Sequence, residues 1–260
     1  MITDLAYKAL IKEVELTPKP GLVDRDNNGS HNDMDINTFY VSAEAIRPYI
    51  QKFLNIKEFK KLRAIGEECE RAMFKATKGV NTHKGMIFSL AVICSAIGNS
   101  SNFDRLHYNI KTLCKDLVKS DLGNISAIKT HGEEFYIKTN NAGIREEAES
   151  GYKTIFEKSL PYYEKQLAKY EEDTALKLTL LYLMRTTQDS TLFARGGKKG
   201  LEFVKNESKK ILHVDNLDKN IRKLDCKMIK RNLSAGGSAD LLALTWFLYK
   251  VKIQGDLREF

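Results

Sequence analysis

The scarcity of proline constrains the fold of this chain more than any other feature. Only four prolines occur among its 260 residues, and proline inside a helix removes a hydrogen bond and clashes with the preceding turn. Between the prolines, apolar residues recur at the three- and four-residue spacing of an amphipathic helix, as in residues 3–16. We therefore expect an all-α protein. Residues 1–260 contain no repeat, low-complexity segment or linker, so we expect a single domain.

Two predicted helices differ from the others because they are apolar almost all round. One runs from about residue 83 to Ile97, with Thr82 as its expected N-cap. The other follows Ser238, which can cap it, and includes Leu241 to Tyr249. A helix that is apolar on every face belongs in the protein interior, and the longest apolar stretch is too short to cross a bilayer. The expected architecture is a multi-helix bundle with these two helices at its centre.

The remaining helices are predicted from the same periodicity and from the glycines and prolines between them. Pro161 is expected to interrupt the chain, and residues 140–143 are expected to form a turn. The other expected helices cover residues 3–16, 37–53, 57–77, 103–119, 122–138, 144 to about 159, 162–168, 171–187, 201–212 and 216–231.

Charge and cysteine content narrow the classes of function. The net charge of +8 favours anionic ligands such as nucleotides, nucleic acids and acidic metabolites, although solvated lysine-rich helix faces are an equally good explanation. The four cysteines lie far apart and form no Cys-x-x-Cys pair, which argues against a structural zinc site. We expect reduced, buried cysteines in a cytoplasmic protein that is not associated with a membrane.

Residues 17–35 are the strongest functional candidate in the sequence. Two prolines and two glycines prevent this segment from forming a helix, and a loop of this length in a compact domain is usually functional or disordered. Fixed turn residues that lead directly into an amphipathic helix favour function. The carboxylates of Asp33 and Asp35 are hard oxygen ligands of the kind that Mg²⁺ prefers.

Three further glycine-bearing segments carry groups suited to phosphate. They are residues 79–85, residues 195–200 (within the basic stretch 189–200) and residues 232–240. Free N–H groups at a helix N-terminus, together with nearby cations, bind anions; an ordinary capped helix or a basic turn is the alternative in each case. If the four segments converge at one end of the bundle, they form a pocket for a magnesium nucleotide. The cations available for its phosphates are Lys19, His83, Lys84, Arg195 and Lys198.

The order of these motifs resembles that of one known family. The sequence contains, in order, residues 18–24 (PKPGLVD), 28–35 (NGSHNDMD), 81–85 (NTHKG), 143–151 (GIREEAESG), 195–197 (RGG) and 236–242 (GGSADLL). Together they resemble the triphosphoribosyl-dephospho-CoA synthase family over nearly the whole chain. The resemblance implies an enzyme that transfers the triphosphoribosyl group of ATP to the 2′-hydroxyl of 3′-dephospho-CoA and releases adenine.

The resemblance also implies what the protein meets in the cell. ATP and 3′-dephospho-CoA are the substrates, and Mg²⁺ accompanies the triphosphate. The product is the precursor of the prosthetic group on the acyl carrier protein of citrate lyase or of malonate decarboxylase. It passes to a holo-acyl-carrier-protein synthase, and no nucleic acid takes part.

Each requirement of this chemistry has candidate residues. A carboxylate must take the proton of the attacking hydroxyl or protonate the departing adenine, and Asp24 and Asp240 are the candidates. Asp33, Asp35 and Glu147 are the predicted Mg²⁺ ligands. The residues predicted to bind phosphate or other parts of the substrates are Lys19, His31, Asn81, His83, Lys84, Arg145, Arg195, Gly196, Gly197, Lys198, Gly236, Gly237 and Ser238.

Two other functions fit parts of this pattern. An all-α, Mg²⁺-dependent nucleotide or ADP-ribosyl hydrolase would use the same groups, and only a requirement for the acceptor distinguishes it from a transferase. A basic helical module that binds nucleic acid without catalysis is the second alternative. The special residues lie in short turns beside apolar helices and not along one exposed face, which argues against this second alternative.

Overall fold

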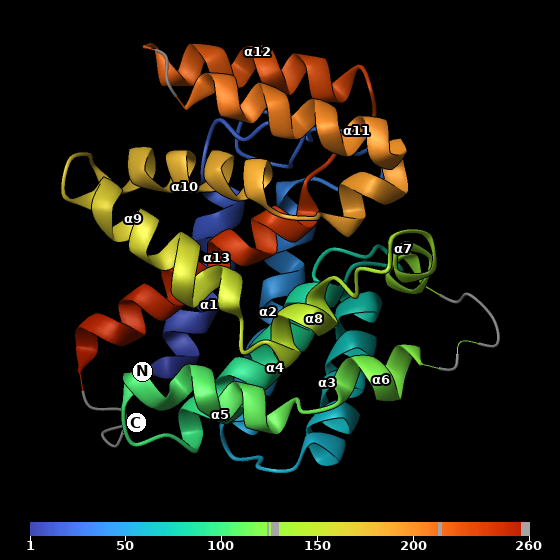
Figure 1. Ribbon diagram of the computed structural model, residues 1–260, viewed down its shortest axis with the longest axis vertical. Coiled ribbons are helices and arrows are strands. Elements are labelled where there is room, and N and C mark those ends of the chain that lie inside the picture. Colours follow the sequence, from blue (N-terminus) through green and yellow to red (C-terminus); the bar gives the residue numbers. More distant parts are fainter. Residues whose placement is uncertain (124, 126–129, 213–214, 256–260) are drawn as a thin grey trace.

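The computed structural model describes residues 1–260 except 124, 126–129, 213–214 and 256–260. The described residues form helices joined by loops and contain no β-strand, so the all-α prediction is confirmed (Figure 1). The longer helices are α1 (Ile2–Glu15), α2 (Ile36–Leu54), α3 (Phe59–Ala76), α4 (Lys84–Gly98), α10 (Glu172–Thr186), α11 (Ser190–Ile211), α12 (Leu217–Ile229) and α13 (Gly236–Gln254). The shorter ones are η1 (Phe103–Arg105), α5 (Leu106–Leu113), α6 (Leu117–Leu122), α7 (His131–Thr139), α8 (Ile144–Glu149), the π-helix η2 (Ile155–Ser159) and α9 (Leu160–Leu167).

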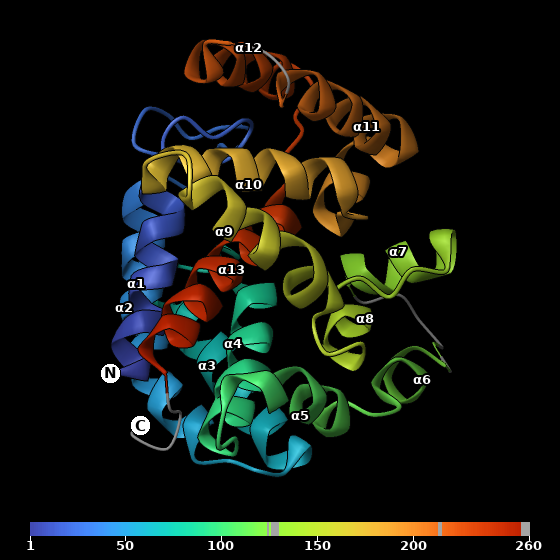
Figure 2. The ribbon, with the colours of Figure 1, turned by 60° about the vertical axis from the view of Figure 1, so that its left-hand side comes forward.

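The two apolar helices, α4 and α13, lie in the interior of the bundle, as predicted (Figure 2). Eleven residues of each helix are buried, and each large apolar side chain removed from water stabilises the fold by about 1.5–3 kcal/mol. Helices α1, α2 and α3 cover one side of this pair, and α9, α10 and α11 cover the other. Among the described residues, no helix has the length and apolar character needed to cross a membrane.

Two helix predictions in the middle of the chain, for residues 103–119 and 122–138, are wrong. The segment 103–119 is divided into η1, α5 and the start of α6, because Asp116 adopts a left-handed conformation (φ 60°) that ends the regular helix. The predicted helix 122–138 is replaced by the end of α6 at Leu122 and by α7, which begins after its N-cap Thr130. Residues 124 and 126–129 of that prediction lie outside the described residues.

The prediction that Pro161 interrupts the chain is also wrong. The break comes earlier, where Gly151 and Tyr152 both adopt positive φ (79° and 58°) after α8. The π-helix η2 then runs directly into α9, and Pro161 lies in the first turn of α9. Proline is tolerated there because its fixed φ suits the start of a helix.

Within the basic stretch 189–200, helical structure begins earlier than predicted. Asp189 caps α11 by accepting hydrogen bonds from the backbone N–H groups of Thr191 and Leu192 (3.0 and 3.1 Å), so the helix begins at Ser190 and not at residue 201. Gly197 (φ 56°) absorbs a kink within this helix. Gly196 and Gly197, which suggested a phosphate loop, therefore lie at a kink where two helical segments of α11 meet.

The loop between α1 and α2, residues 16–35, is anchored to the C-terminal part of the chain. Gly21 adopts φ 69°, and its backbone N–H donates to Asp225 of α12 (2.8 Å). A Cβ atom at Gly21 would lie 2.4 Å from the carbonyl oxygen of Leu233, so only glycine allows this approach. The hydroxyl of Ser30 donates to the same carbonyl (2.6 Å). These contacts hold the loop against α12 and the segment that precedes α13.

Candidate active site

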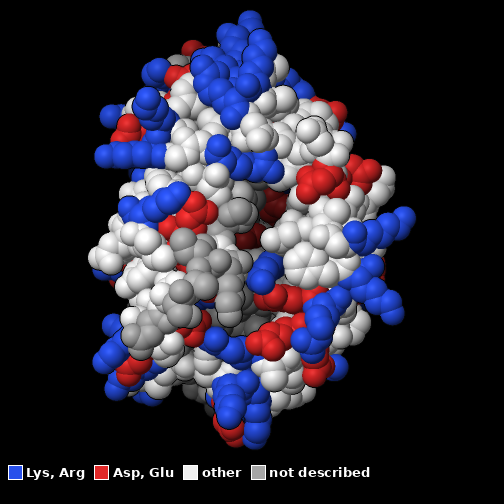
Figure 3. All heavy atoms as spheres, turned by 90° about the vertical axis from the view of Figure 1, so that its right-hand side faces the viewer, with Lys and Arg blue, Asp and Glu red and all other residues white. Residues whose placement is uncertain are grey.

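A cavity of about 870 Å³ opens on one face of the molecule. Figure 3 shows this face, with a hollow near its centre and carboxylate atoms deep inside the hollow. The walls come from the loop 16–35, from the first turns of α4, α11 and α13, and from α8 with the start of the π-helix. Segments that are far apart in the sequence therefore converge on one pocket. The basic stretch contributes only its first residues, Asp189, Ser190 and Thr191, to this lining.

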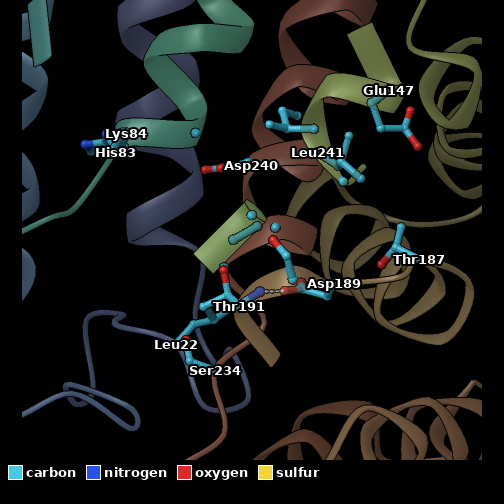
Figure 4. Close-up of a pocket in the computed structure, with 18 of the residues that line it drawn as sticks. Leu22, His83, Lys84, Glu147, Thr187, Asp189, Thr191, Ser234, Asp240 and Leu241 are labelled. Atoms are coloured by element: carbon cyan, nitrogen blue, oxygen red, sulfur yellow. Dashed lines mark hydrogen bonds between the residues drawn. The ribbon is translucent and has the colours of Figure 1, made fainter. Parts of the chain in front are cut away.

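Asp240 lies in the middle of the pocket, in the second turn of α13. Its side chain points toward the first turn of α4 (Figure 4), and a Cβ atom at Gly85 would lie 2.8 Å from its Oδ2. Asp240 is partly exposed in the cavity lining, and desolvation of its carboxyl group, followed by the negative charges of Glu13 and Asp189, raises the pKa of Asp240 well above its ordinary value. A carboxylic acid that stays protonated near neutral pH can act as a proton donor.

Asp189 is a buried carboxylate that sequence reasoning did not assign to the site. One of its oxygens caps α11, and the other accepts from the backbone N–H and the hydroxyl of Ser238 (2.8 and 2.9 Å). The prediction that Ser238 is the N-cap of α13 is therefore wrong. The N-cap is Ala235, and the helix begins at Gly236. The sequence signal for Asp189 was its position immediately before Ser-Thr-Leu, which is typical of an N-cap.

Glu13 and Lys19 form a buried ion pair on the wall of the pocket. Their side chains are only 8% and 1% exposed, and a charge this deeply buried requires a partner. Lys19 was predicted to hold phosphate, and it lines the cavity, but its charge is balanced by Glu13. Glu13 was missed because it occupies the apolar face of the first helix, beside Leu10 and Val14. The presence of a carboxylate on this apolar face was the sequence signal that could have identified Glu13 as a site residue.

The N-terminus of α4 and the residues just before it present Asn81, His83 and Lys84 to the cavity. The N-cap is His83 and not Thr82, whose hydroxyl donates instead to Ser42 (2.7 Å). The side-chain oxygen of Asn81 accepts from the backbone N–H of Lys84 (3.2 Å). Burial, followed by the charge of Lys19, lowers the pKa of His83 to about 3. The imidazole is therefore neutral at physiological pH and acts in hydrogen bonding and not as a cation.

The opposite wall of the cavity is formed by α8 and the residues that follow it. Glu147 accepts from the hydroxyl of Thr154 (2.5 Å) and more weakly from its backbone N–H (3.3 Å). Burial raises the pKa of Glu147. Arg145 also lines the cavity, and its Nε donates to Asp121 (3.0 Å). Lys158 completes the charged groups of this wall.

Three carboxylates predicted for catalysis or for Mg²⁺ do not line the cavity. Asp24 accepts from the backbone N–H groups of Lys19, Asp26 and Asn27, and so shapes the loop. Asp35 is the N-cap of α2 and accepts from the backbone N–H of Thr38 (2.8 Å). The carboxylate of Asp33 is 61% exposed and lies 3.8 Å from His31. The structure gives Asp24 and Asp35 structural contacts and does not bring the predicted Mg²⁺ ligands together.

Arg195 and its neighbours also lie outside the lining. Arg195 donates to the carbonyl oxygen of Ser30 and to the side chain of Asn232 (both 2.7 Å), and its Nη2 lies 3.0 Å from His31 Nδ1. Burial, followed by the charge of Arg195, lowers the pKa of His31 to about 4. Arg195 therefore anchors the loop. Among the residues predicted to bind phosphate, those absent from the lining are Arg195, Gly196, Gly197, Lys198 and Ser238, whereas Lys19, His31, Asn81, His83, Lys84, Arg145, Gly236 and Gly237 line the cavity.

The lining contains more acidic than basic side chains. Six acidic side chains, from Glu13, Glu134, Glu146, Glu147, Asp189 and Asp240, face four basic ones, from Lys19, Lys84, Arg145 and Lys158. Within the described part of the chain, no three His, Cys, Asp or Glu side chains gather closely enough to hold a metal ion by themselves. A pocket of this kind suits an anionic ligand that brings a cation with it.

Comparison with known proteins agrees with this geometry. Residues 1–258 match the family model described as ATP:dephospho-CoA triphosphoribosyl transferase. A protein from Pectobacterium atrosepticum named 2-(5''-triphosphoribosyl)-3'-dephosphocoenzyme-A synthase is 42% identical, with 93% of this chain and 86% of that protein covered. A protein from Photobacterium profundum, named as a probable enzyme of the same kind, is also 42% identical, with 95% and 86% covered.

One solved structure shares the fold. It is the crystal structure of an Archaeoglobus fulgidus protein assigned to the triphosphoribosyl-dephospho-CoA synthases, and it superposes with a TM-score of 0.53. The match covers 82% of this chain and 98% of that chain at 18% sequence identity. At this identity the likeness concerns the arrangement of the helices alone.

Proposed function

Because the chain belongs to the ATP:dephospho-CoA triphosphoribosyl transferase family, we propose that it transfers the 5-triphosphoribosyl group of ATP to the 2′-hydroxyl of 3′-dephospho-CoA. The bond between the ribose C1′ and N9 of adenine breaks, and a bond forms between C1′ and the acceptor oxygen. Adenine takes up one proton as it leaves, and the acceptor hydroxyl loses one. The observation that carries this proposal is the partly buried Asp240, which faces α4 in a pocket lined by several of the family's motif segments.

Asp240 is the proposed acid of the reaction. It lines the cavity, and the surrounding burial and negative charge hold its proton at pH values where an ordinary aspartate is ionised. A protonated carboxyl group can donate to a nitrogen of the departing adenine. Asp24, the other candidate, lies outside the lining and accepts three backbone N–H groups. Its position supports a structural role in the loop.

The negative groups around Asp240 suit the charge that develops during this transfer. As the base departs, the ribose gains oxocarbenium-like positive charge, which fixed carboxylates stabilise. Glu13 and Asp189 are held in place by an ion pair and by four hydrogen bonds, respectively. Preorganised charge of this kind does not have to reorient during the reaction.

The triphosphate is assigned to the first turn of α4 and to the cations around the cavity. Backbone N–H groups in the first turn of a helix have no partner within the helix, and they point toward an approaching anion. Gly85 lies in this turn beside Lys84, and both line the cavity. Arg145 and Lys158 supply positive charge on the opposite wall.

Mg²⁺ is proposed to enter the pocket with ATP. Mg²⁺ sites in nucleotide enzymes commonly combine one or two carboxylates with substrate phosphates, and the acidic lining fits such a complex. Glu147 is the one predicted ligand that lines the cavity, so it would hold the ion together with the phosphates. When bound, Mg²⁺ would neutralise phosphate charge that the carboxylates otherwise repel.

The product is proposed to be the prosthetic-group precursor for the acyl carrier protein of citrate lyase or malonate decarboxylase, which a holo-acyl-carrier-protein synthase would then use. The reaction would take place in the cytoplasm. The four cysteines are free thiols, of which Cys69, Cys94 and Cys114 are buried, and this agrees with a reducing compartment.

The decisive experiment is to incubate the purified protein with ATP, Mg²⁺ and 3′-dephospho-CoA and to follow adenine and the coupled product by chromatography and mass spectrometry. Adenine release that requires 3′-dephospho-CoA, with formation of the triphosphoribosyl adduct, is the expected result. Release of adenine or phosphate without the acceptor would instead identify a hydrolase.

A further inference from the structure

We propose that Asp189 is the positioning residue of this site, because its carboxylate ties the first turn of α13 to the first turn of α11 and thereby fixes Asp240 against α4. This inference rests on the proposed role of Asp240 as the proton donor. Asp189 itself would not exchange protons with the substrates.

The hydrogen bonds of Asp189 connect two helices that approach each other only in the folded protein. Oδ1 accepts from the backbone N–H groups of Thr191 and Leu192 at the start of α11 (3.0 and 3.1 Å). Oδ2 accepts from the backbone N–H and the hydroxyl of Ser238 in the first turn of α13 (2.8 and 2.9 Å). One buried carboxylate, only 3% exposed, therefore satisfies free N–H groups at two helix N-termini, each of which favours negative charge.

The surroundings of this carboxylate are fitted closely to it. A Cβ atom at Gly237 would lie 3.2 Å from Asp189 Oδ2, and one at Gly236 would lie 3.3 Å from the hydroxyl of Thr191. The two glycines thus allow the start of α13 to approach α11. The hydroxyl of Ser238 also lies 3.1 Å from that of Thr187, which donates to the carbonyl oxygen of Leu183 (2.8 Å). We call the hydrogen bonds of Asp189 with Thr191, Leu192 and Ser238 the clamp. Through Thr187 the clamp extends to the C-terminal end of α10.

Asp240 depends on this clamp because it lies two residues after Ser238 on the same helix. Its Oδ2 faces Gly85 so closely that a methyl group at residue 85 would be 2.8 Å away. A small rotation or shift of the first turn of α13 would either press the carboxyl group into α4 or withdraw it from the reacting atoms. Displacements of about 1 Å can reduce catalysis by about a hundredfold.

Asp189 also acts on Asp240 through its charge. The charged and titratable groups around Asp240 are Glu13 from α1, Asp189 at the start of α11, Lys19 from the loop, His83 and Lys84 from α4, and Tyr152 after α8. Farther along α13, Lys250 pairs with Glu172 of α10 (2.8 Å). Burial, followed by Glu13 and Asp189, raises the pKa of Asp240. Removing the charge of Asp189 therefore favours the ionised form of Asp240.

The test is the pH dependence of kcat for acceptor-dependent adenine release. If Asp240 donates a proton, activity is present below its pKa and declines as the pH rises through it. Asp189→Asn retains an oxygen that can cap α11, but its amide group cannot accept from Ser238, and the negative charge is lost. We expect kcat to fall by about tenfold to a hundredfold and the alkaline limb to move to lower pH by about 0.5–1 unit.

Two further variants separate geometry from charge and from general destabilisation. Ser238→Ala removes one hydrogen bond of the clamp and keeps the charge of Asp189, so it should lower kcat severalfold without moving the alkaline limb. Asp225→Asn is the matched control, because Asp225 is also a buried carboxylate that joins two segments, through Gly21 (2.8 Å) and Asn27 (3.0 Å), and it lies outside the cavity lining. It should lower Tm and leave the pH profile in place. Ser238→Ala also tests the clamp if Asp189→Asn does not fold.

The outcomes distinguish this inference from the proposed function. If Asp189→Asn lowers Tm as much as Asp225→Asn but keeps the kcat and the alkaline limb of the wild type, Asp189 is only a helix cap and the inference is wrong. If Asp240→Asn itself keeps the alkaline limb, the proton-donor assignment fails and the inference fails with it. If Asp240→Asn abolishes the limb while Asp189→Asn and Ser238→Ala leave kcat and the limb unchanged, only the positioning role is overturned.

Discussion

Residues 195–200 and residues 232–240 look alike in the sequence but occupy different positions relative to the cavity. Both segments combine a Gly-Gly pair with polar residues beside a helix, and both were interpreted as phosphate-binding turns. The second segment opens α13 and lines the cavity. The first lies within α11 and outside the lining.

The glycines of the two segments have a common structural purpose, which is close packing. A Cβ atom at Gly196 or Gly200 would lie 2.4 or 2.8 Å from a methyl carbon of Leu233, so α11 packs closely on the segment before α13. Gly236 and Gly237 make a similar approach to Thr191 and Asp189. The difference arises because the N-terminus of α13 faces the cavity, whereas the glycines at the kink of α11 lie outside its lining. Glycine content alone therefore does not identify a phosphate site.

The largest expected effect comes from Asp240, the acidic residue of the segment that faces the cavity. Asp240→Asn removes the proposed proton donor and preserves the size of the side chain. We expect kcat for adenine release to fall by about 10²–10⁴-fold, with Tm preserved because the neutral amide has nearly the size of the protonated carboxyl group that it replaces. Retention of activity within about twofold of the wild type would show that both glycine segments are structural.

The next effect concerns the contact between α13 and α4. In Gly85→Ala the new methyl group would lie 2.8 Å from Asp240 Oδ2, so the carboxyl group must move. We expect kcat to fall by about tenfold, although alanine is the better helix former. Gly66→Ala in α3 is the control, because nothing lies within 4 Å of its Cβ position. Equal kcat values for the two variants would mean that the position of Asp240 against α4 is not important.

The burial of His83 in the cavity wall also predicts that the free energy of unfolding depends on pH. The pKa of His83 is lowered from 6.5 to about 3, so between these values the unfolded chain binds a proton that the folded protein does not. Stability therefore falls as the pH falls below 6.5, by at most about 1.4 kcal/mol per pH unit from this group. The Nδ1 of His83 lies 2.7 Å from the hydroxyl of Ser42. His83→Asn can keep a hydrogen bond to Ser42 but does not titrate in this range. Urea unfolding at pH 7, 6 and 5 should show a smaller loss for the variant, and parallel curves would contradict the prediction.

The smallest effect is expected in the segment that lies away from the cavity. The side chain of Lys198 is 84% exposed and lies 4.0 Å from Glu202. Lys198→Ala should leave the KM for ATP within about twofold and should change stability by less than about 0.5 kcal/mol. Steady-state kinetics with varied ATP tests this directly. A tenfold rise in KM would support the phosphate role predicted from the sequence and would remove the contrast between the two segments.

Much of the fold was accessible from the sequence because periodicity reports which residues face the core. The boundaries of α1, α2, α3 and α10 agree with the predictions to within about two residues. The errors occur where a few local interactions decide the outcome. Asp189 starts a helical segment before the kink at Gly197, and the left-handed conformation of Asp116 divides a predicted helix.

The candidate site was predicted less completely for a different reason. Asn81, His83, Lys84, Arg145, Glu147 and Asp240 line the cavity, as a converging site requires. Asp24 and Asp35 carry the same chemical groups, yet their carboxylates accept backbone N–H groups of the loop and of α2. The sequence shows which side chains can bind a ligand, but it does not show which of them are already engaged by the backbone.

The sequence by itself determined the helical class, the two central apolar helices and the family, because hydrophobic periodicity and motif order are properties of the chain. Only the tertiary structure decided which motifs form the pocket. Asp189 and Asp240 are 51 residues apart in the numbering, and they influence each other because α11 and α13 begin side by side. A carboxylate's hydrogen-bond partners, its burial and therefore its pKa depend on neighbours that folding supplies.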